Sequence, residues 1–414
     1  MESATAGCLL ISPRYQGTRK RVSPEMTYLY EYALCPIYDR ISSLYPTSWS
    51  PNAVTLMGIF ATTLSSLLLL TAMPPDTVFE PPYPTFIPAS LTSQIKQHGA
   101  SSTAPSPLYI TELQPYLSSI FTAESLLFVC GLLNLIYCVA DNTDGRLARR
   151  LQKVSSTGEY LDHGLDCVTS LMSTCVSMSV LGFSFSNIAV TVSLVALGTV
   201  MSHTLHYEEN IFIWGSRYFS VDEAMVFFFL ASWVALLFPN IGTATIPSYI
   251  LYTVLPENVA TLLLPLRCID AALMCCWVAQ LQVIVSILVK SWRVLFRLSS
   301  LALLLNIVFF MFSISYHSTN KYGISGCSFG PLSYVSLWII TMSFSSSIIV
   351  HIPVFAHCEK LSEANPLPLA GTLLICLVFI CCPTGGMLLA VAWHVGQIYS
   401  NLGQLVAPSR FHVL

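Results

Sequence analysis

Four aspartates, one glutamate and one histidine stand between positions 141 and 166 of a chain that otherwise carries few charges. Asp141 and Asp144 are three residues apart, so on a helix they share one face, with Gly145 beside them. A second group with helical spacing follows, formed by Glu159, Asp162, His163 and Asp166. Carboxylate oxygens are the ligands that hard divalent cations prefer. The spacing therefore predicts a cation site built from oxygen ligands.

This acidic segment lies between two long apolar runs, at 125–140 and 167–185. Its carboxylates are therefore expected where membrane helices meet water, and ionisable groups at that depth are functional candidates. The connection at 150–157 is short and polar. We expect the two helices to form a hairpin with both acidic faces near its mouth.

The composition excludes an ordinary soluble domain. Of the 414 residues, 54% are hydrophobic and only 9% charged, whereas soluble domains average about a quarter charged residues. We predict an all-α, polytopic membrane protein. No basic block is long enough to indicate a nucleic-acid partner. The 14 cysteines are scattered mostly through apolar runs without metal-type pairing, so we expect reduced, buried thiols.

Apolar runs of about 17 to 25 residues predict about ten transmembrane helices. We place them at 52–72, 119–141, 160–184, 187–207, 220–238, 268–290, 296–316, 331–354, 367–382 and 385–404. Residues 243–266 are an open case, because they could add a short span although their prolines favour a loop.

The rest of the chain is organised around these helices. Residues 1–50 contain no hydrophobic signal core, so we expect no cleaved signal peptide. Positions 28–45 mix apolar and charged residues, which predicts an N-terminal amphipathic helix in the membrane interface. The predicted domains are a segment at 1–50, a catalytic core at 51–238 with a proline-rich insertion at 74–118, a loop at 239–267 and the remaining helices at 268–414.

Basic residues predict the orientation, because loops rich in Lys and Arg face the cytoplasm. Alternating from a cytoplasmic N-terminus, the connections near Arg149, Arg293 and Lys360 all fall on the cytoplasmic side. The acidic hairpin then faces the cytoplasm, while the insertion and the 239–267 loop face the lumen.

The acidic segment also fits the pattern D-x2-D-G-x2-A-R-x8-G-x3-D-x3-D at every fixed position. The eight positions are Asp141, Asp144, Gly145, Ala148, Arg149, Gly158, Asp162 and Asp166. The sequence thus resembles the CDP-alcohol phosphatidyltransferase family, whose members join a CDP-linked group to an alcohol in the membrane. Glu159 after Gly158 and His163 after Asp162 are similar to the eukaryotic choline/ethanolamine phosphotransferase branch, which has about ten spans. Weaker similarity extends to 51–58, 206–208 and 397–402.

The resemblance implies which residues bind the donor substrate. Asp141, Asp144, Asp162 and Asp166 are expected to hold two divalent cations, Mg²⁺ with Mn²⁺ as a substitute. These ions would neutralise the charge that builds as CMP is displaced. Gly145 and Ala148 are expected to leave room for the nucleotide, and Arg149 to contact phosphate. Close helix packing is the alternative explanation for the two small residues.

The acceptor implied by the resemblance is diacylglycerol, whose hydroxyl must lose a proton. His163 is expected to act as the general base, with Glu159 four residues earlier positioned to contact its ring. Asp166 is the competing candidate for the base. The remaining histidines that we considered are interpreted as structural: His203, His206, His351, His357 and His394.

A further acidic group follows the fourth predicted span, close to Tyr207, Trp214 and Tyr218. It comprises Glu208, Glu209, Asp222 and Glu223. An ammonium head group would bind favourably to such anions and aromatic faces. A solvated loop explains the same residues equally well.

The expected activity is transfer of phosphoethanolamine or phosphocholine from CDP-ethanolamine or CDP-choline to diacylglycerol, which releases CMP and forms the phospholipid. The resemblance also implies a homodimer in the endoplasmic reticulum or Golgi membrane. One alternative keeps the family but changes the acceptor, for example to inositol or a glycerol phosphate. The other is a divalent-cation transporter, which would place polar residues near mid-membrane on several spans.

Overall fold

The computed structural model describes residues 27–72, 115–183, 185–216, 218–242, 244–263, 266–319, 329, 332–361 and 367–406. Within these ranges the fold is helical, and the only β-pairing consists of isolated bridges. The prediction of an all-α membrane bundle is confirmed. The basic residues at 14–21 and most of the predicted insertion lie outside the described residues.

A helix coincides with each predicted span. These helices are α2 (Pro51–Ala72), α5 (Ala123–Arg150), α6 (Ser156–Val180), α7 (Phe185–Glu209), α8 (Val221–Leu237), α11 (Cys268–Lys290), α12 (Leu298–Thr319), α13 (Tyr334–Cys358), α14 (Leu367–Cys381) and α15 (Pro383–Val406). By length and composition, α2, α5, α7, α11 and α13 can cross a membrane, and α12 and α14 contain shorter apolar stretches. The predicted boundary between the last two spans shifts slightly, because α15 begins at Pro383, in the first turn that proline tolerates.

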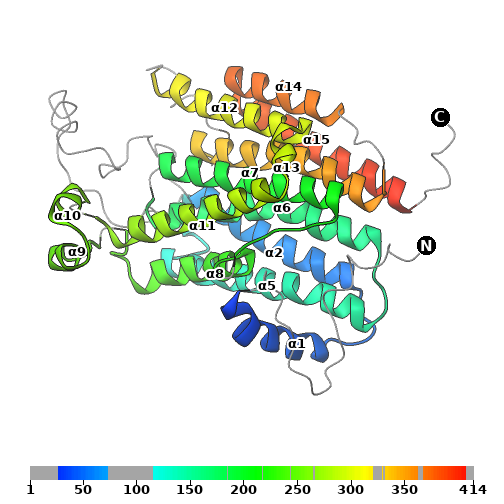
Figure 1. Ribbon diagram of the computed structural model, residues 1–414, viewed down its shortest axis with the longest axis horizontal. Coiled ribbons are helices and arrows are strands. Elements are labelled where there is room, and N and C mark those ends of the chain that lie inside the picture. The colour runs from blue at the N-terminus through cyan, green and yellow to red at the C-terminus, as the bar shows by residue number, and fades with distance from the viewer. Residues whose placement is uncertain are drawn as a thin grey trace.

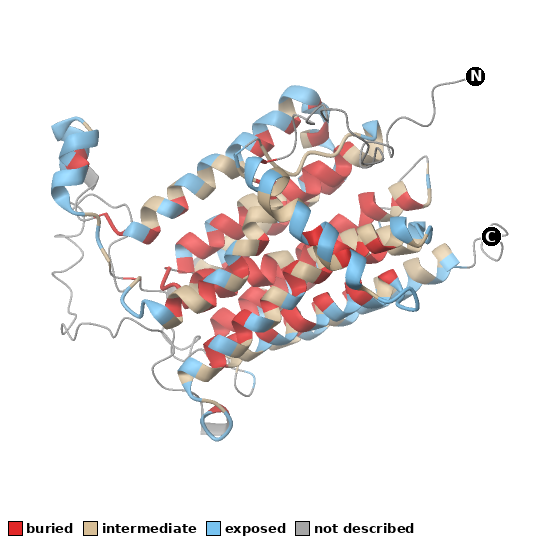
Figure 2. Ribbon diagram, turned by 90° about the horizontal axis from the view of Figure 1, so that it is seen from below, coloured by how far each residue is buried: buried red, intermediate tan, exposed pale blue. Residues whose placement is uncertain are grey.

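Helix α13 is at the centre of the bundle (Figure 1). In its most apolar stretch of 18 residues, 89% of the residues are buried. The helix packs against α6, α7, α12, α14 and α15. Small residues such as Ser345 and Ser346 are fully buried along it, which allows neighbouring helices to approach closely. Asn306 of α12 donates to Ser345 Oγ at 3.2 Å. Figure 2 shows the buried residues concentrated along the middle of the bundle.

The acidic segment forms the predicted hairpin between α5 and α6. Helix α5 ends at Arg150 and α6 begins at Ser156, so five residues connect them. Ser155 caps α6, because its hydroxyl accepts a hydrogen bond from the Gly158 amide at 3.1 Å. This cap fixes the start of α6 and hence the direction in which its carboxylates point.

A short N-terminal helix packs on α5. The π-helix η1 (Tyr30–Leu34) continues into α1 (Cys35–Leu44). Arg146 of α5 donates to the Tyr30 hydroxyl at 2.7 Å and also pairs with Asp39. Burial raises the pKa of Tyr30 to about 12, so the phenol stays neutral beside the guanidinium. The helix predicted over 28–45 is present, and its place in the membrane interface stays a prediction.

The segment between α8 and α11 is not an additional span. It contains α9 (Ser248–Val254) and α10 (Glu257–Leu263), each seven residues long. Such helices extend about 10 Å, far less than the roughly 30 Å of a bilayer core. They lie beyond one end of the bundle (Figure 1), with Pro256 between them. Another short helix, α4 (Pro115–Ser118), precedes α5.

Candidate active site

Three of the predicted aspartates converge where α5 and α6 meet. One oxygen from each of Asp141, Asp162 and Asp166 lies within 4.8 Å of the other two. We call these residues the aspartate cluster. In the described part of the chain no lysine or arginine forms an ion pair with any of them. Carboxylates this close repel one another unless protons or a cation compensate their charge. The donor set therefore fits a divalent cation that prefers oxygen ligands.

Asp144 is not among the three residues whose oxygens converge. Its side chain is buried, and it accepts hydrogen bonds from the Thr55 hydroxyl at 2.5 Å and from the Gly145 amide. Thr55 reaches it from α2. The structure therefore brings together three of the four predicted metal ligands and places the fourth in a hydrogen-bonded position on the same turn of α5.

Tyr137 and Thr55, to which the sequence analysis gave no role, orient the carboxylates of Asp166 and Asp144. Tyr137 donates to Asp166 Oδ1 at 3.2 Å, and Thr169 donates to the Tyr137 hydroxyl at 3.4 Å. Thr55 lies in the 51–58 segment, whose weaker similarity to the family could have marked it as a candidate site residue. No feature of the sequence marked Tyr137, because a tyrosine one turn before an acidic motif is indistinguishable from a core residue.

Gly145 and Arg149 form an open surface beside the carboxylates. A Cβ atom at Gly145 would meet only the Arg149 guanidinium, at 3.4 Å, and Arg149 is exposed. A Cβ atom at Gly58, in contrast, would lie 2.7 Å from the Ala140 Cβ. Gly58 is therefore required for the contact between α2 and α5, whereas helix packing does not explain Gly145. Ala148 is half-buried on the same stretch of α5.

His163 lies in an aromatic environment next to the aspartate cluster. Its ring centroid is 5.5 Å from that of His203 and 5.3 Å from that of Phe212. The expected contact with Glu159 is not made in the described structure. Glu159 Oε1 instead lies 3.5 Å from His357 Nε2, because α13 packs against α6 and its last turn brings this imidazole to the carboxylate.

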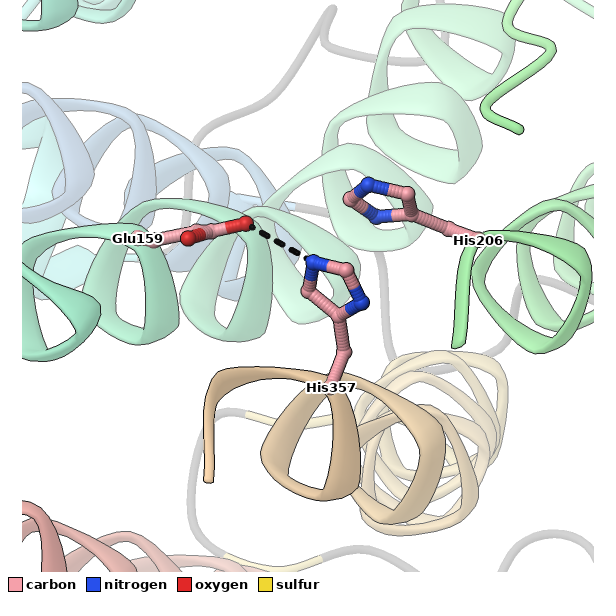
Figure 3. Close-up of side chains that lie close together, drawn as sticks. All are labelled: Glu159, His206 and His357. Carbon is pink, nitrogen blue, oxygen red and sulfur yellow. Dashed lines mark ion pairs between the residues drawn. The ribbon is translucent and has the colours of Figure 1, made fainter. Parts of the chain in front are cut away.

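A second cluster of possible ligands surrounds Glu159. Its carboxylate and the rings of His206 and His357 each place one donor atom within 4.8 Å of the other two. Figure 3 shows the three side chains pointing toward one another from three helices. We call these residues the histidine cluster. The sequence analysis interpreted both histidines as structural, since neither lies near the other or near Glu159 in the sequence.

Three of the four acidic residues at the end of α7 and the start of α8 have ion-pair or hydrogen-bond partners, and Glu209 is exposed. Glu208 pairs with Arg297, and Glu223 accepts hydrogen bonds from Thr27 and from the amide of Ser220, at 2.8 Å for the amide. Asp222 accepts from the Ser220 hydroxyl at 3.1 Å. These contacts cap α8 and tie down the end of α7, which supports the structural interpretation of this group over head-group binding.

The model of the family described as CDP-alcohol phosphatidyltransferase matches residues 109–317, about half of the chain and including the whole α5–α6 hairpin. The chain belongs to this family. The family that the acidic motif predicted is thus confirmed.

Similar curated proteins carry choline or ethanolamine in their names. Human ethanolaminephosphotransferase 1 is 23% identical over 203 residues, which are 47% of this chain and 42% of the human protein. Choline/ethanolaminephosphotransferase 1 of Arabidopsis thaliana is 27% identical over 142 residues, which are 34% of this chain and 26% of that protein. The matches span less than half the length of these relatives. They support a transferase of the family in a membrane and leave the substrates to be inferred.

Proposed function

We propose that this CDP-alcohol phosphatidyltransferase transfers phosphoethanolamine or phosphocholine from its CDP ester to diacylglycerol, releasing CMP. The observation that carries the proposal is the aspartate cluster, three carboxylates within 4.8 Å of one another at one end of the α5–α6 hairpin. The choice of alcohol rests on the relatives, whose names include ethanolamine and choline.

The donor would bind along the open surface of α5. Bound Mg²⁺, or Mn²⁺ in its place, would neutralise the diphosphate and the charge on departing CMP. Asp141, Asp162 and Asp166 would hold two such ions together with Asp144. The bare backbone at Gly145, with Ala148 one turn on, leaves space for the nucleotide, and the forked donors of Arg149 suit its phosphates.

The acceptor hydroxyl would be activated on α6. His163 takes the proton as the hydroxyl oxygen forms its bond to the alcohol-bearing phosphorus, and the bond from that phosphorus to CMP breaks. Glu159, one helical turn earlier, would position the His163 ring once it is released from His357. Asp166 is the competing base, but its Oδ1 already accepts from Tyr137. Histidine is the side chain that most often serves as a general base.

The test is CMP release by the purified full chain with CDP-ethanolamine or CDP-choline, with and without diacylglycerol. We expect release that requires both the lipid and Mg²⁺. His163→Ala should reduce turnover about 100-fold or more, the usual contribution of a general base, while CDP-alcohol binding measured by calorimetry persists. Loss of binding in that variant would contradict the assignment of His163 as the base, and release with inositol or glycerol phosphate alone would contradict the acceptor.

Several parts of the proposal concern the whole enzyme. We propose residues 51–238 as the catalytic core, although the family match continues to 317 and so includes α11 and most of α12. A homodimer in the endoplasmic reticulum or Golgi membrane, with the aspartate cluster facing the cytoplasm, belongs to the same proposal. The transporter alternative is disfavoured because the two clusters of possible ligands in the described chain meet at the same end of the bundle, on α6.

A further inference from the structure

The histidine cluster has the composition of a metal site of another kind. Glu159 lies in the first turn of α6, while His206 and His357 lie in the last turns of α7 and α13. One donor atom of each falls within 4.8 Å of the other two, and the side chains converge as Figure 3 shows. Three helices thus meet at one point through side chains that can all ligate a cation.

The separation of Glu159 and His357 is compatible with a shared ion. Glu159 Oε1 and His357 Nε2 are 3.5 Å apart. A hydrogen bond between such groups would measure about 2.7 to 3.2 Å. Two ligands about 2.1 Å from one tetrahedral Zn²⁺ would be about 3.4 Å apart. The observed distance agrees with the second arrangement.

The donor set decides which ion fits. Imidazole nitrogen favours zinc and other late transition metals, whereas the oxygen-only aspartate cluster favours Mg²⁺ or Mn²⁺. Two histidines and one glutamate also leave a fourth tetrahedral position for water. We propose that Glu159, His206 and His357 bind a Zn²⁺ ion, at a site separate from the aspartate cluster.

The surrounding structure holds the two histidine-bearing helix ends together. Tyr207, next to His206, donates to the Leu361 carbonyl beyond the end of α13, at 3.0 Å. The imidazoles of His206 and His357 stack with centroids 3.8 Å apart. All three ligand side chains are only half-buried, so the rings have room to turn from the stack toward a common ion.

A consequence follows that rests on the proposed function. Glu159 is the carboxylate proposed to position His163, and a carboxylate bound to zinc is withdrawn from that role. Zinc at the histidine cluster would therefore inhibit transfer even when Mg²⁺ fills the aspartate cluster. The two sites are coupled through a single residue of α6.

The first test measures metal content, independently of activity. The full chain, purified in detergent, is equilibrated with Zn²⁺ in excess Mg²⁺, desalted and analysed by mass spectrometry. We expect about one zinc per chain in the parent. The zinc content should fall about tenfold or more in His206→Gln and His357→Gln, because removing even a residue that hydrogen-bonds to a metal ligand lowers affinity about 10- to 100-fold. Glu209→Gln, an exposed carboxylate at the same end of α7, is the control and should retain the ion. Undiminished zinc in both histidine variants would overturn the proposal.

A second measurement uses the unsubstituted protein, so it does not depend on a variant that folds. X-ray absorption at the zinc edge should show nitrogen and oxygen neighbours with the outer scattering of two imidazoles. A sulfur shell would overturn the proposal, because it would assign the ion to exposed thiols such as Cys381 and Cys382. Zinc inhibition of CMP release, relative to each protein's own rate, should then be weaker in His206→Gln than in the parent. Zinc that binds without inhibiting would leave the site in place and refute only its link to His163.

Discussion

The aspartate cluster and the histidine cluster share helix α6 but are completed by different parts of the chain. Asp141, Asp162 and Asp166 come from two helices joined by a five-residue connection. Glu159, in contrast, meets His206 and His357 only because α7 and α13 pack against α6. The aspartate cluster depends on α5 and α6, both of which pack against α2, whereas the histidine cluster depends on where the ends of α7 and α13 meet α6. Substitutions should therefore affect the two sites by separate routes.

The largest effect is expected from removing one carboxylate of the aspartate cluster. Asp162→Asn should lower CMP release by about 100-fold or more, the scale of losing one electrostatic contributor to a transition state. The metal-free protein should unfold at the same or a higher temperature, because an amide relieves repulsion among the three carboxylates. The stabilisation that Mg²⁺ gives the parent should disappear.

Thermal unfolding with and without Mg²⁺, together with the CMP assay, checks this expectation. Glu257→Gln on α10, an exposed carboxylate far from the hairpin in the fold, is the control and should behave as the parent. If Asp162→Asn kept its Mg²⁺-induced stabilisation, the cluster would not be the main metal site.

This division also explains what could be predicted from sequence. The positions of Asp141, Asp162 and Asp166 followed from residues three or four apart on two helices with a short connection, which is local information. Asp144 has the same spacing, yet Thr55 of α2 takes one of its oxygens, and no periodicity identifies which helix supplies such a donor. The span positions were likewise predictable, since apolar runs of sufficient length fix them.

The histidine cluster could not be predicted in this way. His206 and His357 lie far apart in the sequence, and the carboxylates beside them there, Glu208 and Glu359, are not the one that the fold brings to them. Their proximity depends on how α7 and α13 pack around α6, and hydropathy predicts that helices exist but not which ones are neighbours. The same limit applies to Asn401, which donates to the Tyr160 hydroxyl at 2.8 Å across α15 and α6.

An intermediate effect is expected from Gly145→Ala, which asks whether the open surface of α5 binds the nucleotide. The new methyl group would meet the exposed Arg149 side chain, and alanine is favoured over glycine inside a helix by about 0.5–1 kcal/mol, so the unfolding temperature should stay the same or rise. The KM for the CDP-alcohol should rise about tenfold, equivalent to about 1.4 kcal/mol, because the methyl group occupies space that the donor needs.

Gly58→Ala is the matched comparison, with the same substitution on a packed glycine. Its Cβ would lie 2.7 Å from that of Ala140, so overpacking should destabilise the bundle by about 1–3 kcal/mol. Kinetics in each CDP-alcohol and thermal unfolding separate the two variants. A lowered unfolding temperature with unchanged KM in Gly145→Ala would assign this glycine to packing.

The smallest effect is expected from Tyr207→Phe, which tests whether the histidine cluster depends on the contact between the ends of α7 and α13, a contact that the aspartate cluster does not share. The substitution removes the hydrogen bond to the Leu361 carbonyl, worth about 0.5–1.5 kcal/mol. Zinc affinity measured by competition with a chromogenic chelator should fall about two- to tenfold, while the Mg²⁺ concentration for half-maximal CMP release stays constant. Tyr218→Phe serves as the control, because Tyr218 is 79% exposed. Because Asp141, Asp162 and Asp166 lie on α5 and α6, away from the Tyr207 contact, an equal shift in Mg²⁺ dependence would mean that the two sites respond to the bundle as one unit.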